Sequence, residues 1–182
     1  MALGTARSFM NPTAAITHFH LREGDVFADF GTGAGQYIPE LSKAVGTTGR
    51  VYACEIQKGL VERITELVQQ QRLGNVHTIW CDLEVLQGTK LRDGLLDGGM
   101  LLNTLFQLEN KGIALEEIAR VIRKGGKLFV IDWADSFGGI GPHPSHVIKE
   151  DAVKILVEGH GFLFERSFPV ADHHYGLAFR RT

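Results

Sequence analysis

The sequence has few of the features that mark a secreted, fibrous or membrane protein. Its 182 residues include only two cysteines, Cys54 and Cys81, which are too few for a disulfide scaffold and are predicted to be reduced and buried. Five prolines and no low-complexity tract exclude a collagen or a flexible linker. No apolar run approaches the roughly 20 residues that cross a bilayer, and residues 1–20 show no signal-peptide pattern. We therefore expect a cytoplasmic protein without a membrane span.

An excess of charge of one sign is also lacking. The 19 Lys and Arg residues nearly balance the 21 Asp and Glu residues, so the formal net charge is −2 at pH 7. A protein dedicated to nucleic acid has a strongly basic surface, so this balance favours a small molecule as partner. The apolar fraction of 44% and the charged fraction of 22% are typical of a soluble globular chain. The length predicts one domain, residues 21–182, preceded by an N-terminal lid or arm, residues 1–20.

Short apolar runs alternate with helical periodicity along most of the chain. The runs are expected to be buried strands, and they lie at Val26–Phe30, Val51–Glu55, Val76–Trp80, Gly99–Leu102 and Lys127–Ile131. Two last runs, Phe162–Phe168 and Gly176–Phe179, are expected to form an antiparallel pair at one edge. This alternation predicts an α/β sandwich with a mostly parallel sheet. Ligands of such sheets bind beyond the carboxyl ends of the strands, so the residues at those ends are the candidates for function.

The first strand leads into a glycine-rich turn, Asp29-Phe30-Gly31-Thr32-Gly33-Ala34-Gly35, which is followed by helical spacing from Gln36 to Ala44. Glycines let backbone amides approach a ligand closely, although a tight turn with no ligand would also use them. A dinucleotide-binding turn has the spacing G-x-G-x-x-G, and here the third glycine comes one residue early. Asp29 would repel a pyrophosphate, whereas it suits a positive charge such as an amino-acid ammonium group.

Acidic residues also end the next two strands. Glu55 follows Gly31 by a distance at which a carboxylate can accept hydrogen bonds from both hydroxyls of a ribose. Asp82, directly after Cys81, can accept from an exocyclic amine such as that of adenine. Each has a plainer alternative, a glutamate at a helix start and an aspartate helix cap. Together the three acids predict a ligand with an amino-acid end, a ribose and an adenine, and without phosphate.

With these motifs the sequence resembles the class I S-adenosylmethionine-dependent methyltransferases. The resemblance runs from Asp25 to Arg181, and its start, as far as Lys58, is similar to the ubiquinone/menaquinone-biosynthesis type of methyltransferase. Its motifs are Asp29–Gly35, Glu55, Cys81-Asp82, Asp97–Asn103 and Arg120–Leu128. The resemblance implies a three-layer, Rossmann-like sandwich whose seven-stranded sheet has the order 3-2-1-4-5-7-6 with strand 7 antiparallel. It also implies S-adenosylmethionine as cofactor.

The resemblance assigns expected roles to the residues at the strand ends. Asp29 and the backbone of Gly31, Thr32, Gly33 and Gly35 would bind the methionine part of the cofactor. Glu55 would hold the ribose, while Ile56, Asp82 and Leu83 would frame the adenine. Asn103 would lie near the sulfonium and face the acceptor. The implied reaction is in-line methyl transfer to a small molecule, and the alternatives are a protein or RNA acceptor or a non-catalytic cofactor-binding protein.

The acceptor side is harder to assign from sequence. The expected substrate contacts are Phe106, Trp133 and His143, and the candidates for a catalytic base or orienting group are Asp132 and His173. Phe106, Asp132 and Trp133 follow the fourth and fifth strands, and the two histidines lie in late loops. A base is required only if the acceptor is protonated at neutral pH. His143 and His146 have ligand-like spacing, but a metal needs more ligands, so no metal is expected. A nicotinamide-dependent oxidoreductase is disfavoured by the glycine spacing, and the protein is expected to be a monomer or a homodimer.

Overall fold

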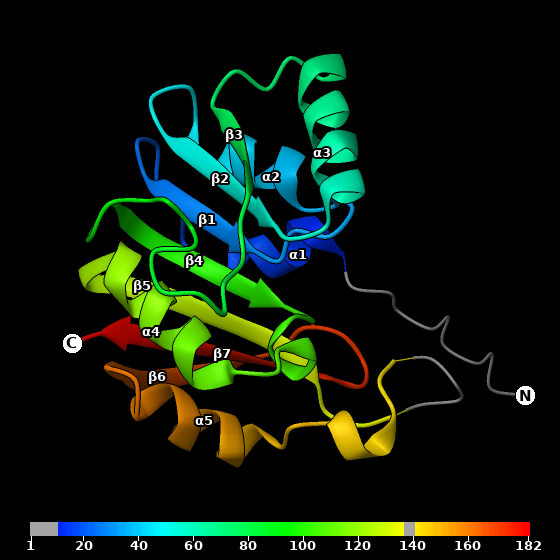
Figure 1. Ribbon diagram of the computed structural model, residues 1–182, viewed down its shortest axis with the longest axis vertical. Helices are drawn as coiled ribbons and strands as arrows, with labels where there is room; N and C mark the ends of the chain where they lie inside the picture. Colours follow the sequence, from blue (N-terminus) through cyan, green and yellow to red (C-terminus); the bar gives the residue numbers. More distant parts are fainter. Residues whose placement is uncertain (1–10, 137–140) are drawn as a thin grey trace, which may run out of the picture.

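The molecule is built around one seven-stranded sheet, seen in a computed structural model that describes residues 11–136 and 141–182 (Figure 1). The strand order is β3-β2-β1-β4-β5-β7-β6, and β7 runs antiparallel to both of its neighbours. The order that the sequence resemblance implied is therefore confirmed. The strands are β1 (Val26–Phe30), β2 (Arg50–Glu55), β3 (Val76–Trp80), β4 (Leu96–Leu102), β5 (Ile122–Trp133), β6 (Phe162–Phe168) and β7 (His174–Arg181).

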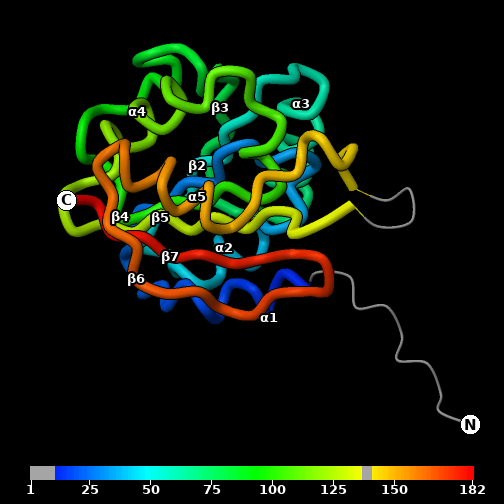
Figure 2. The backbone as a smooth tube through the Cα atoms, turned by 90° about the horizontal axis from the view of Figure 1, so that it is seen from below, coloured from blue at the N-terminus to red at the C-terminus, as the bar shows by residue number. Residues whose placement is uncertain are grey.

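Helices cover both faces of the sheet and make it the middle of three layers (Figures 1 and 2). One face packs against α1 (Pro12–Thr17), α2 (Ile38–Val45) and α3 (Lys58–Gln70). The other face packs against α4 (Lys111–Val121) and α5 (Glu150–Glu158). Two short 3₁₀ turns, η1 (Leu105–Gln107) and η2 (Pro144–His146), follow β4 and precede α5. No helix among the described residues is long and apolar enough to cross a bilayer.

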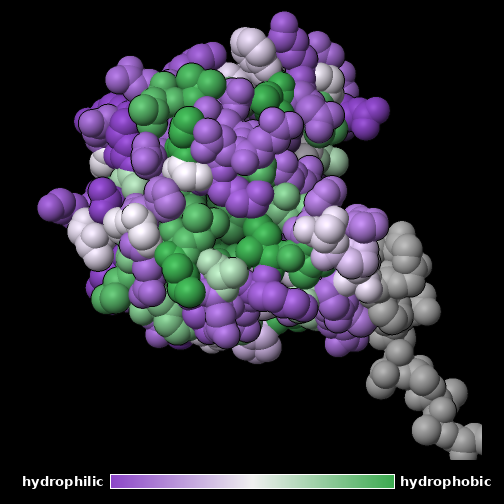
Figure 3. All heavy atoms as spheres, turned by 60° about the horizontal axis from the view of Figure 1, so that its bottom comes forward, coloured by the Kyte–Doolittle hydropathy of each residue, from purple (hydrophilic) through white to green (hydrophobic). Residues whose placement is uncertain are grey.

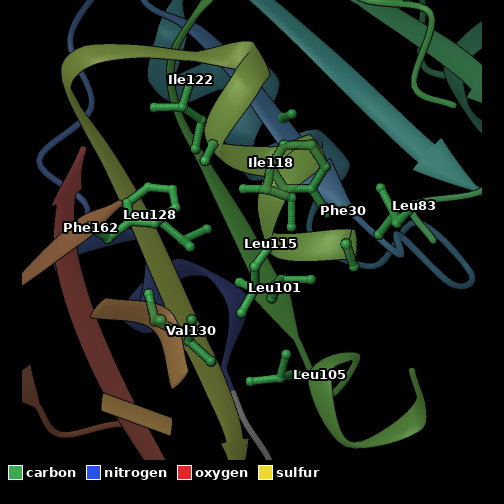
Figure 4. Packing of buried hydrophobic residues seen from close by; sticks show 14 of the residues in the cluster. Phe30, Leu83, Leu101, Leu105, Leu115, Ile118, Ile122, Leu128, Val130 and Phe162 are labelled. Carbon is green, nitrogen blue, oxygen red and sulfur yellow. The ribbon is translucent and has the colours of Figure 1, made fainter. Parts of the chain in front are cut away.

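The core between the sheet and α4 shows why these segments fold as they do (Figure 4). Leu115 and Ile118, three positions apart on α4, lie on one side of the helix and meet Phe30, Leu101 and Leu128 from three neighbouring strands. All five side chains are fully buried. Burial of such side chains contributes about 1.5–3 kcal/mol each, so this packing holds β1, β4 and β5 at fixed positions.

The strand expected at Lys127–Ile131 begins earlier in the structure, before the glycine pair Gly125-Gly126. Helix α4 ends at Val121, and Ile122 begins β5 by pairing with Leu96. The register then shifts between Leu96 and Gly98, so the glycines lie in a bulge of β5. A Cβ on Gly126 would stand 2.7 Å from a methyl group of Ile122 and 2.8 Å from the Asp97 carbonyl oxygen, which explains glycine there.

The described part of the N-terminal segment packs on the sheet. Ala15 and Ile16 of α1 are buried, and the Phe19 ring stacks on Phe129 of β5 with ring centroids 4.3 Å apart. Residues 1–10 lie outside the described residues, so the predicted division of the chain at residue 20 stays a prediction.

The surface is mixed: the face brought forward in Figure 3 has apolar side chains gathered near its centre and polar ones around them.

Candidate cofactor site

A cavity of about 470 Å³ lies at the carboxyl ends of β1, β2, β3 and β4. This is the position at which ligands of parallel sheets bind. Nine of the ten residues predicted to hold the cofactor line this cavity: Asp29, Gly31, Thr32, Gly33, Glu55, Ile56, Asp82, Leu83 and Asn103. The tenth, Gly35, is outside the lining; an added Cβ there would stand 3.1 Å from the Leu67 side chain of α3, and the φ of +80° favours glycine.

The glycine-rich turn is fixed to the neighbouring strand. The backbone N–H groups of Gly31 and Thr32 both donate to the Cys54 carbonyl oxygen, at 2.9 and 3.0 Å. Gly31 has φ +83°, and a Cβ there would stand 2.6 Å from the Thr104 side chain. A residue with a side chain at this position would therefore be strained and would push β1 and the loop after β4 apart.

Asp29 lies at the floor of the cavity with only 2% of its surface exposed. Burial, followed by the neighbouring charge of Glu55, raises the pKa of the Asp29 carboxyl from an ordinary 3.8 to about 7. A carboxylate in this environment lacks a compensating cation. A positively charged ligand group in the cavity would supply one and would favour the ionised form.

Glu55 connects the glycine-rich turn to the start of α3. Its Oε2 accepts from the Gly33 N–H at 2.9 Å, and its Oε1 accepts from the N–H groups of Ile56 and Gln57 at 3.0 and 2.9 Å. Each carboxylate oxygen has two acceptor positions, so Oε1 is fully used and Oε2 keeps one. The present arrangement has room for one ribose hydroxyl, and bonding to both requires release of one of these amides.

Asp82 takes a turn position. Its Oδ1 accepts from the Glu84 N–H at 2.8 Å, two residues further on, and no helix begins there. The alternative of an aspartate helix cap is therefore wrong for Asp82. The apolar side chains of Ile56 and Leu83 line the same part of the cavity, and Ile56 is 53% exposed. This is a surface on which a flat aromatic ring can lie.

The charges that line the cavity are all of one sign. Four carboxylates face it, from Asp29, Glu55, Asp82 and Glu84, while none of the described lining residues is lysine, arginine or histidine. A phosphate would find no cation here. A ligand with an ammonium and a sulfonium group, and without phosphate, fits this set of side chains.

Asn103 follows β4 in a left-handed backbone conformation, with φ +52°. Asparagine tolerates this conformation better than most residues. Its backbone N–H donates to the Ile131 carbonyl oxygen at 2.8 Å, which fixes the residue to β5. Its side-chain Oδ1 is buried and has no hydrogen-bond partner among the described residues, and the residue lines the cavity.

Tyr37 is a lining residue that the sequence analysis did not single out. Its side chain is 4% exposed, and its hydroxyl is buried without a hydrogen-bond partner among the described residues. Burial, and then the charge of Asp29, raise the pKa of the phenol to about 12. Leaving a buried hydroxyl unpaired costs about 1–3 kcal/mol. The feature of the sequence that could have indicated Tyr37 is its position two residues after Gly35, because the chain that leaves the turn is still close to the ligand there.

Asp132, predicted as a base or orienting group, lies outside the lining of this cavity. It is 1% exposed, and its two oxygens accept from the backbone N–H groups of Phe106 and Trp133 at 3.1 and 2.9 Å. Burial raises the pKa of Asp132 to about 6, against these hydrogen bonds, which lower it. In this arrangement Asp132 attaches η1 to the end of β5.

The other residues predicted for the acceptor side also lie outside the cavity lining. The ring of Trp133 packs against His174, with centroids 4.1 Å apart. The Nδ1 of His173 lies 2.8 Å from an Asp135 carboxylate oxygen. The Nδ1 of His143 lies 2.8 Å from the Ser145 hydroxyl. Phe106 is half-buried in η1. Within the described ranges, no group of three or more His, Cys, Asp or Glu side chains is placed to hold a metal ion.

The fold and the cavity together define a class I S-adenosylmethionine-dependent methyltransferase. A family model described as a methyltransferase domain matches residues 28–130, from β1 to β5. The chain therefore belongs to the methyltransferase-domain family of these enzymes. The sequence resemblance and the implied cofactor, S-adenosylmethionine, are confirmed at this level.

Individual relatives agree with this assignment. A solved structure of a SAM-dependent methyltransferase from Aquifex aeolicus is 31% identical, with a TM-score of 0.87 over 95% of this chain and 90% of that one. The ubiquinone/menaquinone biosynthesis C-methyltransferase of Hydrogenovibrio crunogenus is 32% identical over 121 residues, which are 66% of this chain and 46% of that protein. This chain thus spans about half the length of the curated relatives it matches. The structure of the Burkholderia thailandensis 1,6-didemethyltoxoflavin-N1-methyltransferase has the same fold, with a TM-score of 0.72 at 22% identity over 95% of this chain and 78% of that one.

Proposed function

We propose that this protein transfers the methyl group of S-adenosylmethionine to a small-molecule acceptor. The observation that carries the proposal is the convergence of Asp29, Glu55 and Asp82, from the ends of three neighbouring strands, on one cavity without a lining cation. These carboxylates match the ammonium, ribose and adenine groups of the cofactor, in the order in which the strands lie.

The residues predicted for the cofactor that line the cavity have distinct roles in holding it. Asp29 pairs with the ammonium group, and the backbone of Gly31, Thr32 and Gly33 contacts the methionine part. The Thr32 hydroxyl holds the turn by donating to the Asp29 carbonyl oxygen at 2.9 Å. Glu55 accepts from the ribose. Ile56 and Leu83 pack on the adenine, and Asp82 accepts from its amine. Asn103 lies at the sulfonium end and faces the acceptor.

The chemistry requires little more from the protein than position. The cofactor supplies a methyl group on a sulfonium, which is already a good leaving group. The cavity holds the acceptor in line with the methyl group and keeps water out, and such positioning can provide most of the rate enhancement. An acceptor that is deprotonated at neutral pH needs no base. Asp132, His173, Phe106, Trp133 and His143 remain predictions for the acceptor side.

A small acceptor is supported by the relatives as well as by the near-neutral charge of the chain. One relative is named for ubiquinone and menaquinone biosynthesis, and another for methylation of 1,6-didemethyltoxoflavin. Quinones and 1,6-didemethyltoxoflavin are small molecules. We further infer a cytoplasmic protein, a monomer or homodimer, in which residues 21–182 form the catalytic domain and residues 1–20 a lid or arm.

Calorimetry and a turnover assay test the proposal. S-adenosylmethionine and S-adenosylhomocysteine should both bind and stabilise the protein, and NAD should do neither. Label from methyl-labelled cofactor should then appear in the low-molecular-weight fraction of a cell extract. Label in protein or RNA would overturn the small acceptor, and binding without transfer to any fraction would indicate a non-catalytic binder. Absence of binding would overturn the whole proposal.

A further inference from the structure

A second cavity lies at the opposite end of the sheet from the cofactor cavity. It has a volume of about 280 Å³ and opens where β1 and β4 begin, beside the first half of β5, with residues 19–22 and part of β6 among its walls. The residues that line it and those that line the cofactor cavity have no member in common. A ligand in this second cavity would therefore occupy a place of its own.

The floor of the second cavity is aromatic. Phe27 of β1 and Phe129 of β5 line it, and the Phe19 ring stacks on both, with centroids 5.9 Å and 4.3 Å away. Gly98 of β4 lies between these strands, and a Cβ there would stand 2.9 Å from the Lys127 carbonyl oxygen and 3.1 Å from the Phe27 ring. Without a side chain at Gly98, the floor stays open to an apolar group of a ligand.

Two carboxylates in the wall of the second cavity already have cations as partners. Asp97 accepts from Arg123 Nε at 2.7 Å. Glu165 accepts from Lys127 and from Arg180 Nε, the latter at 2.6 Å. These charges largely neutralise one another, so they leave neither a free carboxylate for a cationic ligand nor a strong attraction for an anion.

Two arginines of the same wall have no such partner. Arg166 is half-buried, donates to the His18 carbonyl oxygen and lies over the Phe168 ring, and it forms no ion pair with a described residue. Arg22 is exposed, and only its backbone N–H has a partner among the described residues, Asp25 Oδ2 at 2.8 Å. A guanidinium has five N–H donors, so most of those of Arg166 and Arg22 are left for a ligand. Asp25 is the one further lining carboxylate, which leaves an excess of one positive charge.

The backbone around the second cavity departs from regular structure at two lining residues. His20 has a left-handed conformation with φ +52°, and Gly125, with φ +77°, lies in the bulge of β5. Left-handed residues other than glycine are uncommon, and both they and β-bulges concentrate at binding and active sites. Their occurrence together at this cavity is typical of a site shaped for a ligand.

We propose that this cavity is a second binding site, which takes a small carboxylate with an apolar body. The apolar body packs on the floor made by Phe19, Phe27 and Phe129. The carboxylate accepts from the guanidinium of Arg166, and Arg22 adds its charge from the rim. A planar guanidinium suits this group because it can donate two parallel hydrogen bonds to one carboxylate.

The size and charge of the second cavity narrow the class of ligand. At roughly 20–30 Å³ for each non-hydrogen atom, its volume takes about 10–14 such atoms, which is too few for a nucleotide. An excess of one positive charge balances a singly charged carboxylate better than a doubly charged phosphate ester. The cofactor cavity would repel the same ligand, since four carboxylates and no lysine, arginine or histidine are among its described lining residues.

Titration calorimetry of the full chain with 2-naphthoate, with and without saturating S-adenosylhomocysteine, tests the site. We expect 2-naphthoate to bind with a Kd of about 1 mM in both cases. The neutral 2-naphthamide has the same shape and should bind at least about fivefold more weakly. Inorganic phosphate, which has charge without an apolar body, should also bind at least about fivefold more weakly.

Variants locate the bound probe. Arg166→Gln should weaken binding of 2-naphthoate at least about fivefold and leave binding of S-adenosylhomocysteine unchanged. Arg63→Gln, at an exposed position of α3 and outside both cavity linings, is the matched control and should change neither affinity. Arg22→Gln provides a second variant in case Arg166→Gln does not fold, and because Arg22 is exposed the expected loss is only about twofold.

Four results would overturn the second site. They are absence of 2-naphthoate binding, its displacement by S-adenosylhomocysteine, equal affinity for 2-naphthoate and 2-naphthamide, and equal losses in Arg166→Gln and Arg63→Gln. Displacement would place the probe in the cofactor cavity. Phosphate that bound as tightly as 2-naphthoate would overturn the role of the aromatic floor. None of these results bears on methyl transfer, which binding of the donor and turnover test separately.

Discussion

Two carboxylates on opposite faces of the sheet are almost completely buried, and their pKa values are shifted in opposite directions. Asp29, at the cavity, is 2% exposed and has a pKa raised to about 7. Glu117, on α4, is 0% exposed, and although burial acts to raise its pKa, hydrogen bonds from Arg120 and Thr89 lower it to about 2. The difference between them lies in their partners and not in the depth at which they lie.

The partners of Glu117 come from its own helix and from the loop before β4. Arg120 donates to both of its oxygens, at 2.9 and 2.7 Å, and the N–H groups of Gln87 and Thr89 and the Thr89 hydroxyl also donate to it, at 2.8, 3.1 and 2.5 Å. Every acceptor position is used, so this carboxylate serves the fold. Asp29 instead remains without a cation, which is what a binding site for a positive ligand requires.

The largest expected effect is the loss of stability in Glu117→Leu. This change leaves the Gln87 and Thr89 amides without their acceptor, while Arg120 keeps its bonds to Asp93 and the Leu91 carbonyl oxygen. Breaking such a buried network should lower the free energy of unfolding by about 3–5 kcal/mol. Chemical denaturation measures the change. Glu116→Leu, at the exposed neighbouring position of α4, is the control and should change stability by less than about 0.5 kcal/mol. Similar values for the two variants would contradict the structural role of Glu117.

Asp29→Asn should have the opposite effect on stability and abolish tight donor binding. Because the folded state holds the Asp29 carboxylate unfavourably above pH 7, removing its charge should raise the free energy of unfolding at pH 8, on the order of 1–3 kcal/mol. Loss of the partner for the ligand's ammonium group should weaken donor binding at least about 30-fold.

The two effects of Asp29→Asn are measured by denaturation and by calorimetry on the same sample. Asp151→Asn, at an exposed position in the first turn of α5, is the control; it should leave donor binding unchanged and lower stability by no more than about 1 kcal/mol. If Asp29→Asn lost both stability and donor binding, Asp29 would stabilise the fold as Glu117 does. The contrast between the two carboxylates would then be wrong.

Glu55→Gln should have an intermediate effect. It keeps the size of the side chain but weakens its bonds to the Gly33 N–H and to a ligand hydroxyl, because a charged acceptor is stronger than an amide oxygen. We expect donor affinity to fall about tenfold by calorimetry. Glu62→Gln, exposed on α3, serves as the control. Unchanged affinity in Glu55→Gln would rule out the ribose role.

The smallest effect is the dependence of donor binding on pH. The Asp29 carboxyl, with a pKa of about 7 in the folded protein, must lose its proton to face an ammonium group, so donor affinity should fall as the pH drops through 7. At pH 6.5 binding should be about fourfold weaker than at pH 8, and binding should release protons near neutrality. Calorimetry in buffers of different ionisation enthalpy measures both. In Asp29→Asn this dependence should disappear, and its persistence would assign it to another group.

The order of strands and helices could be predicted from the sequence because apolar runs and glycine-rich turns, the two features that indicate it, are both local. Apolar runs such as Val51–Glu55 need only their own residues to be recognised, and a glycine-rich turn that follows one marks the end of a strand. The acids at the ends of β1, β2 and β3 were found in the same way, since parallel strands place their carboxyl ends at one edge. The same reasoning singled out Asp132, whose two oxygens each accept from a backbone amide, and its role on the acceptor side stays a prediction.

Tyr37 escaped prediction because nothing in its neighbourhood in the sequence shows that its hydroxyl would be buried without a partner. The network of Glu117 escaped for a related reason. Its partner Thr89 lies 28 residues earlier in the chain, in a loop whose path no periodicity predicts. Contacts of this kind arise only when the helix packs on the sheet.

The amino-acid sequence by itself determined the succession of strands and helices, the positions of glycines at tight turns and the placing of an acid at the end of each of three strands. These follow from backbone sterics and from the periodicity of apolar side chains, which act over a few residues. Only the tertiary structure decided which buried carboxylate receives partners and which is left for a ligand, since that depends on burial and on charges brought together from distant parts of the chain.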